Sequence, residues 1–456
     1  MRPPDPDSGH ARDAAVAQGP RPPEPINRYT VPQSLAKLRG ARFHVMVKPA
    51  GSACNLDCTY CFYLSKQKLR DGPGAGHMDD DLLDRVIRDY IRSVTADEIV
   101  FSWQGGEPTL LGVEYFEKIV ALQRKHARAG QRVENDLQTN GTLLDDDWAR
   151  FLKQNSFLVG LSIDGPREVH DHFRVTKHAE PTFDKVFAAA QVLRRHGVRF
   201  NTLTCVHRFN ASRPLDVYRF LRRELGSTYL QFIPIVEPRD FATTAPGHHD
   251  IARLPQLGGP EARPDHPDSV VTPWSVDADE YGSFLSKVWD EWRARDFGKV
   301  LVNFCETLVA QKMGLLSQVC VHHEFCGKGV ALEHDGGVYA CDHYVYPEYR
   351  LGNVRQSSLG DMVFSATQVK FGYAKAESLP AYCRKCEWLS DCWGECPRNR
   401  LLRAPDGEPG LNYLCAGLRR FFEHAAPEAR RIAKRLGANQ TAGFKQAPAP
   451  LSARSA

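Results

Sequence analysis

The chain has 456 residues, about three times the ~150 residues typical of one domain, and 42% of them are hydrophobic and 25% charged. Lys and Arg number 59 against 55 Asp and Glu, a net charge of +4, which argues against a polybasic surface for nucleic acid or membranes. No apolar run approaches the ~18 residues of a membrane span, so we expect neither a nucleic-acid partner nor a membrane association.

The N-terminal residues 1–38 are rich in Pro, Ala and charge and contain no apolar segment. They match neither a secretory signal nor an amphipathic transit helix, so we expect a cytoplasmic protein. Residues from about 437 to 456 have a similar composition. We therefore predict a disordered tail at each end of the chain.

Between the tails, short apolar runs alternate with helical patterns as far as about residue 233. Asp79 and Asp145 stand where helix N-caps are expected, and Gly197 follows a helix as a C-cap would. Six strands with five helices between them indicate a (β/α) repeat, either a partial barrel or a doubly wound sheet, with functional residues at the carboxyl ends of the strands. The predicted strands are 43–48, 98–103, 133–138, 157–163, 198–205 and 229–233, and the predicted helices are about 79–93, 112–129, 145–155, 182–196 and 212–225.

The segment 239–275 breaks this rhythm because it is rich in Pro, Gly and His. We predict a long surface insertion whose histidines are solvated, followed by a helix near 277–295. From about residue 300 onward, cysteines and short loops dominate. Such a region is expected to fold around metals rather than around a large apolar core.

The chain has 13 cysteines, an odd number in a protein without an export signal, which argues against a disulfide framework. Eleven of them form two groups, one near the start and one in the last third. Thiolates at short spacing select zinc or iron–sulfur clusters. Cys205 and Cys305 stand alone in apolar sequence, and we predict that both are small buried hydrophobic residues.

The first group, Cys54, Cys58 and Cys61, begins six residues beyond the first predicted strand. Three thiolates are one too few for a four-iron cluster, so one iron would keep open positions for a small molecule. A structural zinc site with a distant fourth ligand is the alternative. Zinc sites rarely use a C-x3-C-x2-C spacing followed by an aromatic residue.

This pattern, placed after the first strand of a (β/α) repeat, resembles the radical S-adenosylmethionine enzyme superfamily. The resemblance implies a partial (β/α)6 barrel of the TIM type, in which the three cysteines hold a [4Fe–4S] cluster. The unique iron of that cluster chelates S-adenosylmethionine, and one-electron reduction yields a 5′-deoxyadenosyl radical. The protein then supplies binding, orientation and exclusion of water.

Residues that could contact the cofactor follow the later strands. Gln104-Gly-Gly-Glu-Pro108 resembles the GGEP motif that contacts the methionine amino group, although a simple turn would also explain it. Ser162 could hydrogen-bond the ribose or the methionine, and Arg174, otherwise a solvated surface arginine, could pair with the methionine carboxylate. The cofactor-binding residues that the resemblance implies are Tyr60, Gln104, Gly105, Gly106, Glu107, Ser162 and Arg174.

The second group has eight thiolates, the number that two four-coordinate clusters require. Two structural zinc ions fit the count as well, but they predict two C-x2-C pairs and only Cys383 and Cys386 have that form. The spacing resembles the SPASM extension of radical enzymes that modify peptides and proteins. That resemblance implies one auxiliary [4Fe–4S] cluster on Cys320, Cys326, Cys341 and Cys396 and a second on Cys383, Cys386, Cys392 and Cys415.

Three local segments, GVYACDHYV at 337–345, YRLGNV at 349–354 and NYLC at 412–415, look like the anaerobic sulfatase-maturating enzymes. The resemblance implies oxidation of a Cys or Ser of a sulfatase polypeptide to Cα-formylglycine. Asp342 is then the general base, although a turn residue or an acceptor for loop amides is the plainer interpretation. Tyr63 is a candidate for orienting the substrate or controlling the radical, and packing against the cluster loop is its alternative.

The sequence leaves two other functions open. One is a radical enzyme of the same architecture that modifies a ribosomally made precursor peptide, and the other is a non-catalytic zinc-binding interaction protein. The resemblance to radical S-adenosylmethionine enzymes also implies a flavodoxin- or ferredoxin-like electron donor. The predicted organisation is a tail over 1–38, a core over 39–238, an insertion and connecting helix over 239–300, a SPASM domain over 301–425 and a C-terminal helix end and tail over 426–456.

Overall fold

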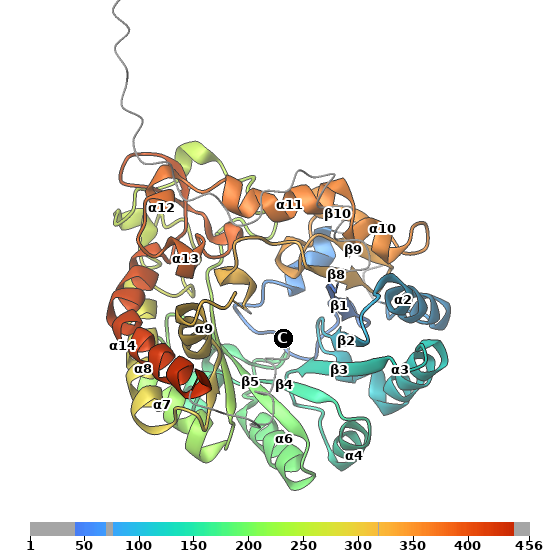
Figure 1. The fold of residues 1–456 in the computed structure, drawn as a ribbon. Helices are drawn as coiled ribbons and strands as arrows, with labels where there is room; N and C mark the ends of the chain where they lie inside the picture. The colour runs from blue at the N-terminus through green and yellow to red at the C-terminus, as the bar shows by residue number, and fades with distance from the viewer. Residues whose placement is uncertain (1–41, 70–75, 318, 442–456) are drawn as a thin grey trace, which may run out of the picture.

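The computed structural model describes residues 42–69, 76–317 and 319–441 (Figure 1). The predicted N-terminal tail lies outside the described residues, and so does the C-terminal tail beyond residue 441. Residues 437–441 belong instead to the last helix, α14 (Cys415–Thr441). The domain boundaries inferred from the sequence stay a prediction.

Six parallel strands follow one another in chain order around a curved, open sheet, and helices cover its outer side (Figure 1). Because the order never reverses, the sheet is not doubly wound, and the predicted partial (β/α)6 barrel is confirmed. The helix α5 (Arg167–Phe173) was not expected, since seven residues are too few to show a periodic pattern. The other elements are β1 (His44–Lys48), α2 (Asp80–Ser93), β2 (Glu98–Trp103), α3 (Gly112–His126), β3 (Arg132–Thr139), α4 (Asp146–Gln154), β4 (Leu158–Ser162), α6 (Phe183–Arg195), β5 (Arg199–Val206), α7 (Pro214–Arg219) and β6 (Tyr229–Pro234).

Local signals start and stop these helices where the sequence indicates. The Asp79 side chain accepts a hydrogen bond from Leu82 N at 2.8 Å, and the Asp145 side chain accepts one from Trp148 N at 2.9 Å. Gly197 follows α6 at φ +64°, a left-handed conformation that ends a helix at little cost for glycine. All three predicted caps are confirmed.

The cysteine-rich region extends the barrel sheet at its first strand. β8 (Gly329–Glu333) lies parallel to β1, with Lys48 opposite Glu333 in the register, and β9 (Gly337–Tyr339) and β10 (Arg350–Asn353) continue the sheet in antiparallel fashion. At the other edge, the short β7 (Leu301–Val302) pairs with β6. The two predicted domains therefore share one ten-stranded sheet.

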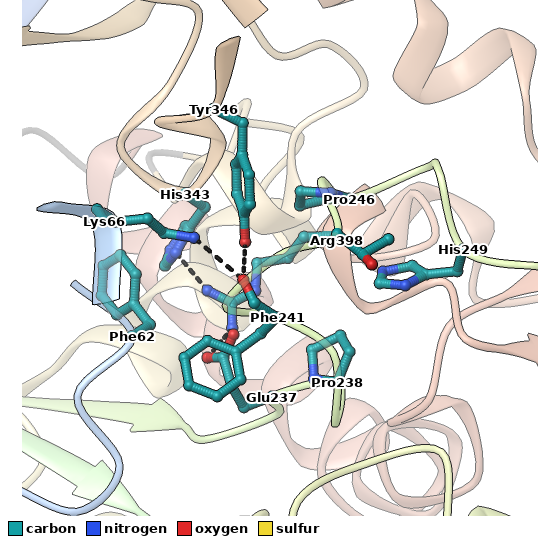
Figure 2. A pocket seen from close by; sticks show the side chains of 11 residues that line it. Phe62, Lys66, Glu237, Pro238, Phe241, Pro246, His249, His343, Tyr346 and Arg398 are labelled. Atoms are coloured by element: carbon teal, nitrogen blue, oxygen red, sulfur yellow. Dashed lines mark hydrogen bonds and ion pairs between the residues drawn. The ribbon is translucent and has the colours of Figure 1, made fainter. Parts of the chain in front are cut away.

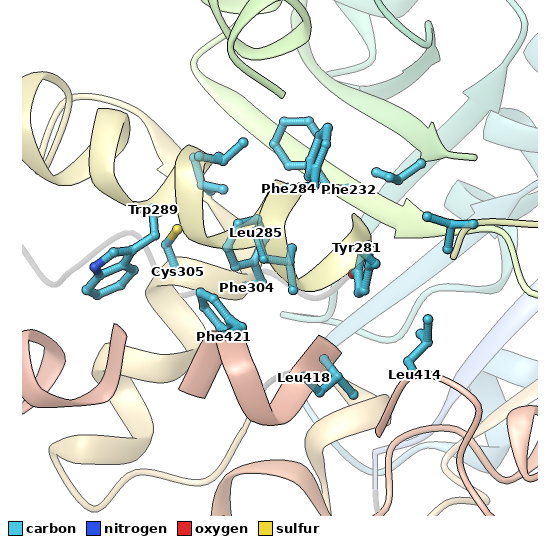
Figure 3. Close-up of a cluster of buried hydrophobic side chains, with 14 of the residues drawn as sticks. Phe232, Tyr281, Phe284, Leu285, Trp289, Phe304, Cys305, Leu414, Leu418 and Phe421 are labelled. Atoms are coloured by element: carbon cyan, nitrogen blue, oxygen red, sulfur yellow. The ribbon is translucent and has the colours of Figure 1, made fainter. Parts of the chain in front are cut away.

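A large apolar core also joins the two halves of the molecule (Figure 3). The helix α14 packs against α8 (Ala278–Arg295) and α9 (Asn303–Lys312), and α8 and α9 pack against β6 through Phe284 and Phe304, whose rings lie 5.2 and 6.1 Å from that of Phe232. α14 crosses α8 so closely that a Cβ at Gly417 would lie 1.8 Å from Ala278 O. The expectation that this region lacks a large apolar core is wrong, because the helices that flank the cysteines carry apolar faces.

Replacing Phe421 with Ala should lower the free energy of unfolding by about 3–5 kcal/mol, since it empties a large volume in this core. Phe421 is 2% exposed, and its ring lies 5.4 Å from that of Phe304 and 6.4 Å from that of Trp289. Denaturant titration of the variant measures the loss. The control Phe209→Ala, at a site 38% exposed, should cost less than about 1 kcal/mol. Equal losses for the two variants would contradict this picture of the core.

The insertion 239–275 lies partly at the surface, as predicted, but other parts of it are packed against the rest of the protein. Val271 is fully buried, and the segment is fastened to the cysteine-rich region by hydrogen bonds from Tyr346 Oη to Phe241 O at 2.6 Å and from Tyr349 Oη to Pro246 O at 2.5 Å. His248 is exposed as expected, but His249 and His266 are partly buried. Proline and glycine content indicates the absence of regular structure and says little about burial.

Among the described residues, no helix has both the length and the apolar character needed to cross a membrane.

The remaining elements each have 12 residues or fewer. These elements are η1 (Leu64–Leu69), η2 (Pro108–Leu111), η3 (Phe220–Glu224), η4 (Ile251–Arg253), η5 (Pro260–Ala262), η6 (Cys320–His322), η7 (Asp342–Tyr344), η8 (Pro347–Tyr349), α10 (Leu359–Val363), α11 (Ala366–Glu377), α12 (Ala381–Arg384), α13 (Leu389–Cys392), η9 (Pro397–Asn399), β11 (Leu402–Arg403) and β12 (Pro409–Leu411).

Candidate active site

The first cysteine group lies in the loop that follows β1. Burial, with a smaller contribution from the neighbouring thiols, raises the pKa of Cys54 to about 11 and that of Cys58 to about 12, and it raises the pKa of Cys61 as well. Leu56 N and Asn140 Nδ2 donate to Cys54 Sγ at 3.4 and 3.8 Å. Hydrogen bonds of this kind stabilise a thiolate and tune the potential of a cluster. Binding of these thiols to a metal would release their protons and leave thiolate ligands.

The segment after α5 holds the backbone of this loop in place. Asp57 N donates to Val175 O at 2.9 Å, and Thr59 N donates to Phe173 O at 3.2 Å. Arg174 therefore stands between two backbone contacts to the cysteine loop. The charge of Arg174 lowers the pKa of Cys58, but burial raises that pKa by more.

The two glycines after β2 are required by a close approach of two loops. Gly106 N donates to Gly51 O and Glu107 N donates to Ala53 O, both at 2.8 Å. A Cβ at Gly106 would lie only 2.0 Å from Ala53 O, and Gly105 has φ +129°, a conformation that side chains rarely adopt. The segment therefore fixes the start of the cysteine loop.

Gly106→Ala should displace the cysteine loop, and we expect it to lose most of the iron of the first cluster and most S-adenosylmethionine cleavage. Gly76→Ala is the matched control, because its Cβ would meet His334 at 3.6 Å, an ordinary contact. Iron content and cofactor cleavage after anaerobic reconstitution measure both variants. A Gly106→Ala enzyme with the iron content and cleavage rate of the wild type would show that the loops tolerate a wider separation.

The carboxylate of Glu107 is fully buried and engaged by the protein itself. It accepts hydrogen bonds from Thr109 N at 3.0 Å, Thr109 Oγ1 at 2.6 Å, Thr139 Oγ1 at 2.7 Å and Asn140 N at 2.7 Å. Burial raises the pKa of Glu107. The side chain therefore ties the end of β2 to the end of β3.

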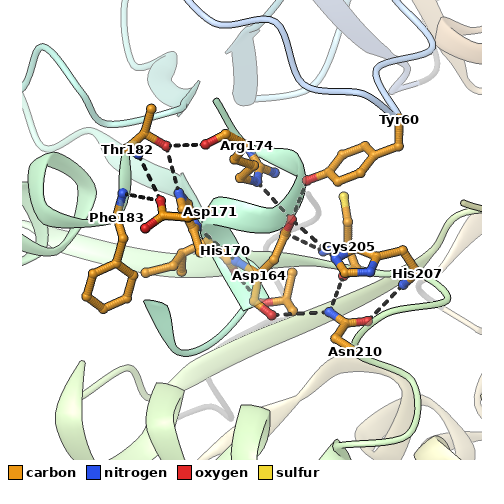
Figure 4. A network of polar contacts seen from close by, with 12 residues as sticks. Tyr60, Asp164, His170, Asp171, Arg174, Thr182, Phe183, Cys205, His207 and Asn210 are labelled. Atoms are coloured by element: carbon orange, nitrogen blue, oxygen red, sulfur yellow. Dashed lines mark hydrogen bonds and ion pairs between the residues drawn. The ribbon is translucent and has the colours of Figure 1, made fainter. Parts of the chain in front are cut away.

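Asp164 is the centre of a buried polar network at the ends of β4 and β5 (Figure 4). Its carboxylate accepts hydrogen bonds from the Tyr60 hydroxyl, from Arg174 Nε at 3.1 Å and from Cys205 N at 3.1 Å. The fully buried His207 lies 3.8 Å from the same carboxylate and stacks on Tyr60. Cys205 thus lies in a polar network, so its predicted apolar surroundings are wrong, whereas Cys305 is buried in the apolar core as predicted.

Two other predicted contacts lie on the inner side of the barrel. Ser162 is the last residue of β4 and is 8% exposed. Gln104 follows β2, its N–H bonds Val47 O at 2.9 Å, and its side chain lines a cavity inside the barrel. The carboxyl ends of β1, β2 and β4 therefore bring the predicted cofactor contacts to one edge of the sheet.

The structure brings the second cysteine group together as two sets of four. Burial is the largest cause of the raised pKa of six of these thiols, and neighbouring thiols of the same set raise it further for Cys326, Cys341, Cys396, Cys383, Cys392 and Cys415. Among the described residues, the side chains do not converge on a single-ion position, whereas a [4Fe–4S] cluster holds its four thiolates on four separate irons. The sets are Cys320, Cys326, Cys341 and Cys396, and Cys383, Cys386, Cys392 and Cys415.

Asp342 reaches the barrel through a chain of buried contacts. Its carboxylate forms an ion pair with the ammonium of Lys48, which is 2% exposed at the end of β1. Lys48 Nζ lies 3.5 Å from the centre of the Tyr63 ring, and Tyr63 Oη donates to Glu333 at 2.7 Å. Burial acts to raise the pKa of Asp342, but the charges of Lys48 and His343 outweigh it and hold the pKa below its ordinary value.

A second group of charged and aromatic side chains adjoins Asp342 (Figure 2). Arg398 donates to Glu237 at 2.6 Å and contacts His343 Nδ1 at 2.5 Å. Lys66 lies 3.4 Å from the centre of the Tyr346 ring, and burial lowers the pKa of this lysine to about 7. The insertion thus meets the cysteine loop and the segment that carries Asp342 at one place.

Sequence reasoning missed Lys48, Asp164 and Glu333. Each is a charged residue at the carboxyl end of an apolar strand. This local pattern would have been enough to identify Lys48 and Asp164 as candidates. Glu333 depends on the pairing of β8 with β1, which no local pattern predicts.

The radical SAM superfamily matches residues 49–221, and the SPASM iron–sulfur cluster-binding domain matches residues 324–387. A serine-type anaerobic sulfatase-maturating enzyme of Bacteroides thetaiotaomicron is 41% identical over 393 residues, which are 86% of this chain and 92% of the relative. The chain belongs to the anaerobic sulfatase-maturating enzymes. The predicted radical enzyme, its dependence on S-adenosylmethionine and its [4Fe–4S] clusters are thereby confirmed.

The relatives of this anaerobic sulfatase-maturating enzyme include both serine-type and cysteine-type enzymes. A cysteine-type enzyme of Clostridium perfringens is 33% identical over 86% of this chain and 98% of its own length. The solved structure of native anSMEcpe with bound AdoMet and the Cp18Cys peptide has a TM-score of 0.72 at 33% identity and covers 86% of this chain and 99% of that one. Membership of this family favours sulfatase maturation over the precursor-peptide and zinc-binding alternatives.

Proposed function

We propose that this enzyme oxidises a Cys or Ser side chain of a sulfatase polypeptide to Cα-formylglycine, with Asp342 as the general base. The observation that carries the proposal is the ion pair of Asp342 with Lys48, which joins the segment after Cys341 to the end of the first barrel strand. A carboxylate at that junction lies beside the cysteine loop, since Lys48 also contacts Tyr63, two residues beyond Cys61.

When bound, the first cluster and S-adenosylmethionine supply a 5′-deoxyadenosyl radical that takes a hydrogen atom from the target Cβ, and the auxiliary clusters supply a path for the departing electron. Asp342 accepts the proton of the target thiol or hydroxyl. With a Cys target, water then replaces the sulfur of the resulting thioaldehyde, which leaves as sulfide. Lys48 holds the Asp342 carboxylate ionised and in place. Tyr63, fixed by its hydrogen bond to Glu333, orients the target residue beside them.

The cluster ligands follow the three sets of thiols. Cys54, Cys58 and Cys61 hold the cluster that binds S-adenosylmethionine. The remaining eight cysteines hold two fully ligated auxiliary clusters, the first on Cys320, Cys326, Cys341 and Cys396 and the second on Cys383, Cys386, Cys392 and Cys415. Support comes from thiols that raise the pKa of another thiol in the same set, as Cys61 does for Cys54, Cys341 for Cys396 and Cys383 for Cys415.

Contacts to S-adenosylmethionine come from the barrel edge. Because the Glu107 carboxylate is engaged by four protein donors, the backbone carbonyls of Gly105 and Gly106 accept from the methionine ammonium. Arg174, oriented by Asp164 through Nε, pairs with the methionine carboxylate through its terminal nitrogens. Ser162 and Gln104 contact the ribose and methionine parts, and Tyr60 supports Arg174 through Asp164.

The proposal also includes a flavodoxin- or ferredoxin-like electron donor and a cytoplasmic location. The first cluster needs one-electron reduction at a low potential, which such carriers supply. An odd number of cysteines, eleven of them assigned to clusters, is suited to a reducing compartment.

Paired peptides test the function. A Cys-x-Pro-x-Arg peptide and the matching Ser-x-Pro-x-Arg peptide are incubated anaerobically with reconstituted enzyme, S-adenosylmethionine and a reductant. We expect an aldehyde, trapped by a hydrazine and located by mass spectrometry, at the first position of at least one peptide. A peptide with Ala there is the control. Cofactor cleavage without aldehyde in either peptide would contradict the proposal.

A further inference from the structure

One arginine lies close to both sets of thiols in the second cysteine group, the first set with Cys396 and the second set with Cys383. Arg400 directly follows η9, and its side chain is partly buried. Its Nη1 donates to Ser378 Oγ at 2.6 Å, and its Nη2 donates to Lys375 O at 2.7 Å. Both acceptors lie at the carboxyl end of α11. The guanidinium is therefore held in a fixed position.

The chain segment that anchors Arg400 is tied to both sets. The ammonium of Lys375 donates to Cys320 O at 2.8 Å, which fastens this end of α11 to the first set. Shortly after α11, Cys383 N donates to Pro380 O at 2.9 Å, and the second set begins there. Arg400 thus bridges a segment that carries Cys396 and a segment that leads to the second set.

A glycine lets the guanidinium approach the stretch that links the two sets. Gly394 stands between Cys392 of the second set and Cys396 of the first set, and it has φ +68°. A Cβ at Gly394 would lie 3.1 Å from Arg400 Nη2 and 2.3 Å from Leu379 Cδ2. A side chain at this position would crowd the arginine, so the glycine keeps the cation against the backbone of the linking stretch.

The charge of Arg400 has no carboxylate partner among the described residues. Its terminal nitrogens donate to uncharged oxygens, and its buried Nε has no hydrogen-bond partner there. The buried carboxylate of Glu395 accepts instead from Asn399 Nδ2 at 2.9 Å and from Asn412 Nδ2 at 2.7 Å. A cation withdrawn from water is unfavourable without an anion, so we expect an anionic group beside Arg400 in the functional protein.

Thiols from both sets act on this charge. Burial lowers the pKa of Arg400 most, whereas the thiols of Cys383 and Cys396, one from each set, raise it. A guanidinium stays charged in proteins, and cluster binding turns thiols into thiolates. The two auxiliary clusters are therefore the anionic groups that suit this cation.

We infer that Arg400 raises the reduction potentials of both auxiliary clusters, because its positive charge stabilises an added electron on either one. Reduction adds one negative charge to a cluster, and the charges around a cluster help to set its potential. The inference rests on the proposed function, which places the clusters on these thiols. In that proposal, the carbon radical of the substrate gives one electron to the clusters, and they pass it to an oxidised flavodoxin- or ferredoxin-like carrier.

Redox titration of the reconstituted holoenzyme without peptide, followed by EPR spectroscopy, measures the effect. The auxiliary clusters are identified by the signals that S-adenosylmethionine leaves unchanged. In Arg400→Gln, we expect the ratio of reduced to oxidised auxiliary cluster at the wild-type midpoint potential to fall at least tenfold, or about 59 mV for a one-electron couple. Arg400→Lys keeps the charge and loses the planar fork, so it should recover most of the ratio.

Arg403→Gln is the matched control, because Arg403 also donates to the protein through its terminal nitrogens, to Ile251 O at 2.7 Å and to Gly407 O at 2.9 Å. Its auxiliary clusters should keep the wild-type potentials. Arg400→Met also removes the charge, and it takes the place of Arg400→Gln should that variant lose its auxiliary iron.

Wild-type potentials in either neutral variant would overturn the inference, and so would an Arg400→Lys variant with potentials as low as those of Arg400→Gln. Loss of iron from both neutral variants would also overturn it, since Arg400 would then act in cluster assembly. Because the titration contains no peptide, its result is separate from formylglycine formation. An enzyme with shifted potentials that forms no formylglycine would reject the proposed function alone.

Discussion

Replacing Asp342 with Asn is expected to lower the rate of peptide oxidation roughly 10²–10⁴-fold, the range that a general base contributes. The amide keeps the size of the side chain but cannot take the proton of the target thiol or hydroxyl. S-adenosylmethionine cleavage should stay largely intact, because the first cysteine loop is untouched. Formylglycine and 5′-deoxyadenosine are measured in the same anaerobic reactions.

The exposed Asp335, in the turn between β8 and β9, is the matched control, since its carboxylate accepts a hydrogen bond from Gly337 N at 2.9 Å and an amide oxygen can do the same. Asp335→Asn should therefore oxidise peptide at the wild-type rate. If Asp342→Asn also did so, Asp342 would not be the base. A parallel loss of cofactor cleavage would show instead that the ion pair with Lys48 supports the first cluster.

Replacing Cys54, Cys58 and Cys61 together with Ala should remove about four of about twelve irons per chain and all S-adenosylmethionine cleavage. The two sets of cysteines in the second group lie on other segments, so their clusters should remain. Iron and zinc are counted on anaerobically purified protein. Cys305→Ala is the control, because that thiol is fully buried in the apolar core and should hold no iron.

Zinc in place of iron in the wild-type protein would overturn this assignment of all three sets. An unchanged iron content in the triple variant would place the first cluster elsewhere. Loss of all twelve irons would mean that the first cluster is needed for the cysteine-rich region to fold, a coupling that the shared sheet makes physically reasonable.

The barrel could be predicted from the sequence because its signals are local. Each strand is a short apolar run, each helix repeats every 3.6 residues, and caps such as Asp79 and Asp145 bond a backbone N–H three residues away. The C-x3-C-x2-C spacing is equally local. These features survive any tertiary arrangement, so a single sequence is enough to find them.

The site itself depends on contacts between distant segments. Lys48 meets Asp342 and Tyr63 meets Glu333 because β8 adds to the sheet beside β1, and this pairing joins residues almost three hundred positions apart. The insertion is fastened to the cysteine-rich region because Tyr346 and Tyr349 bond its carbonyls, which its Pro- and Gly-rich composition does not reveal. The surroundings of Cys205 differ from the prediction for a related reason, since its neighbours in space include Asp164 and Tyr60, which come from other segments of the chain.

The origin of the hydrogen atom lost from the target residue tests the central claim most directly. A Cys-x-Pro-x-Arg peptide deuterated at the Cβ of its cysteine is given to the reconstituted enzyme, with the matching serine peptide alongside. Mass spectrometry then follows the deuterium in a single turnover. The account predicts one deuterium in 5′-deoxyadenosine for each formylglycine formed, whereas formylglycine without deuterium transfer would contradict it.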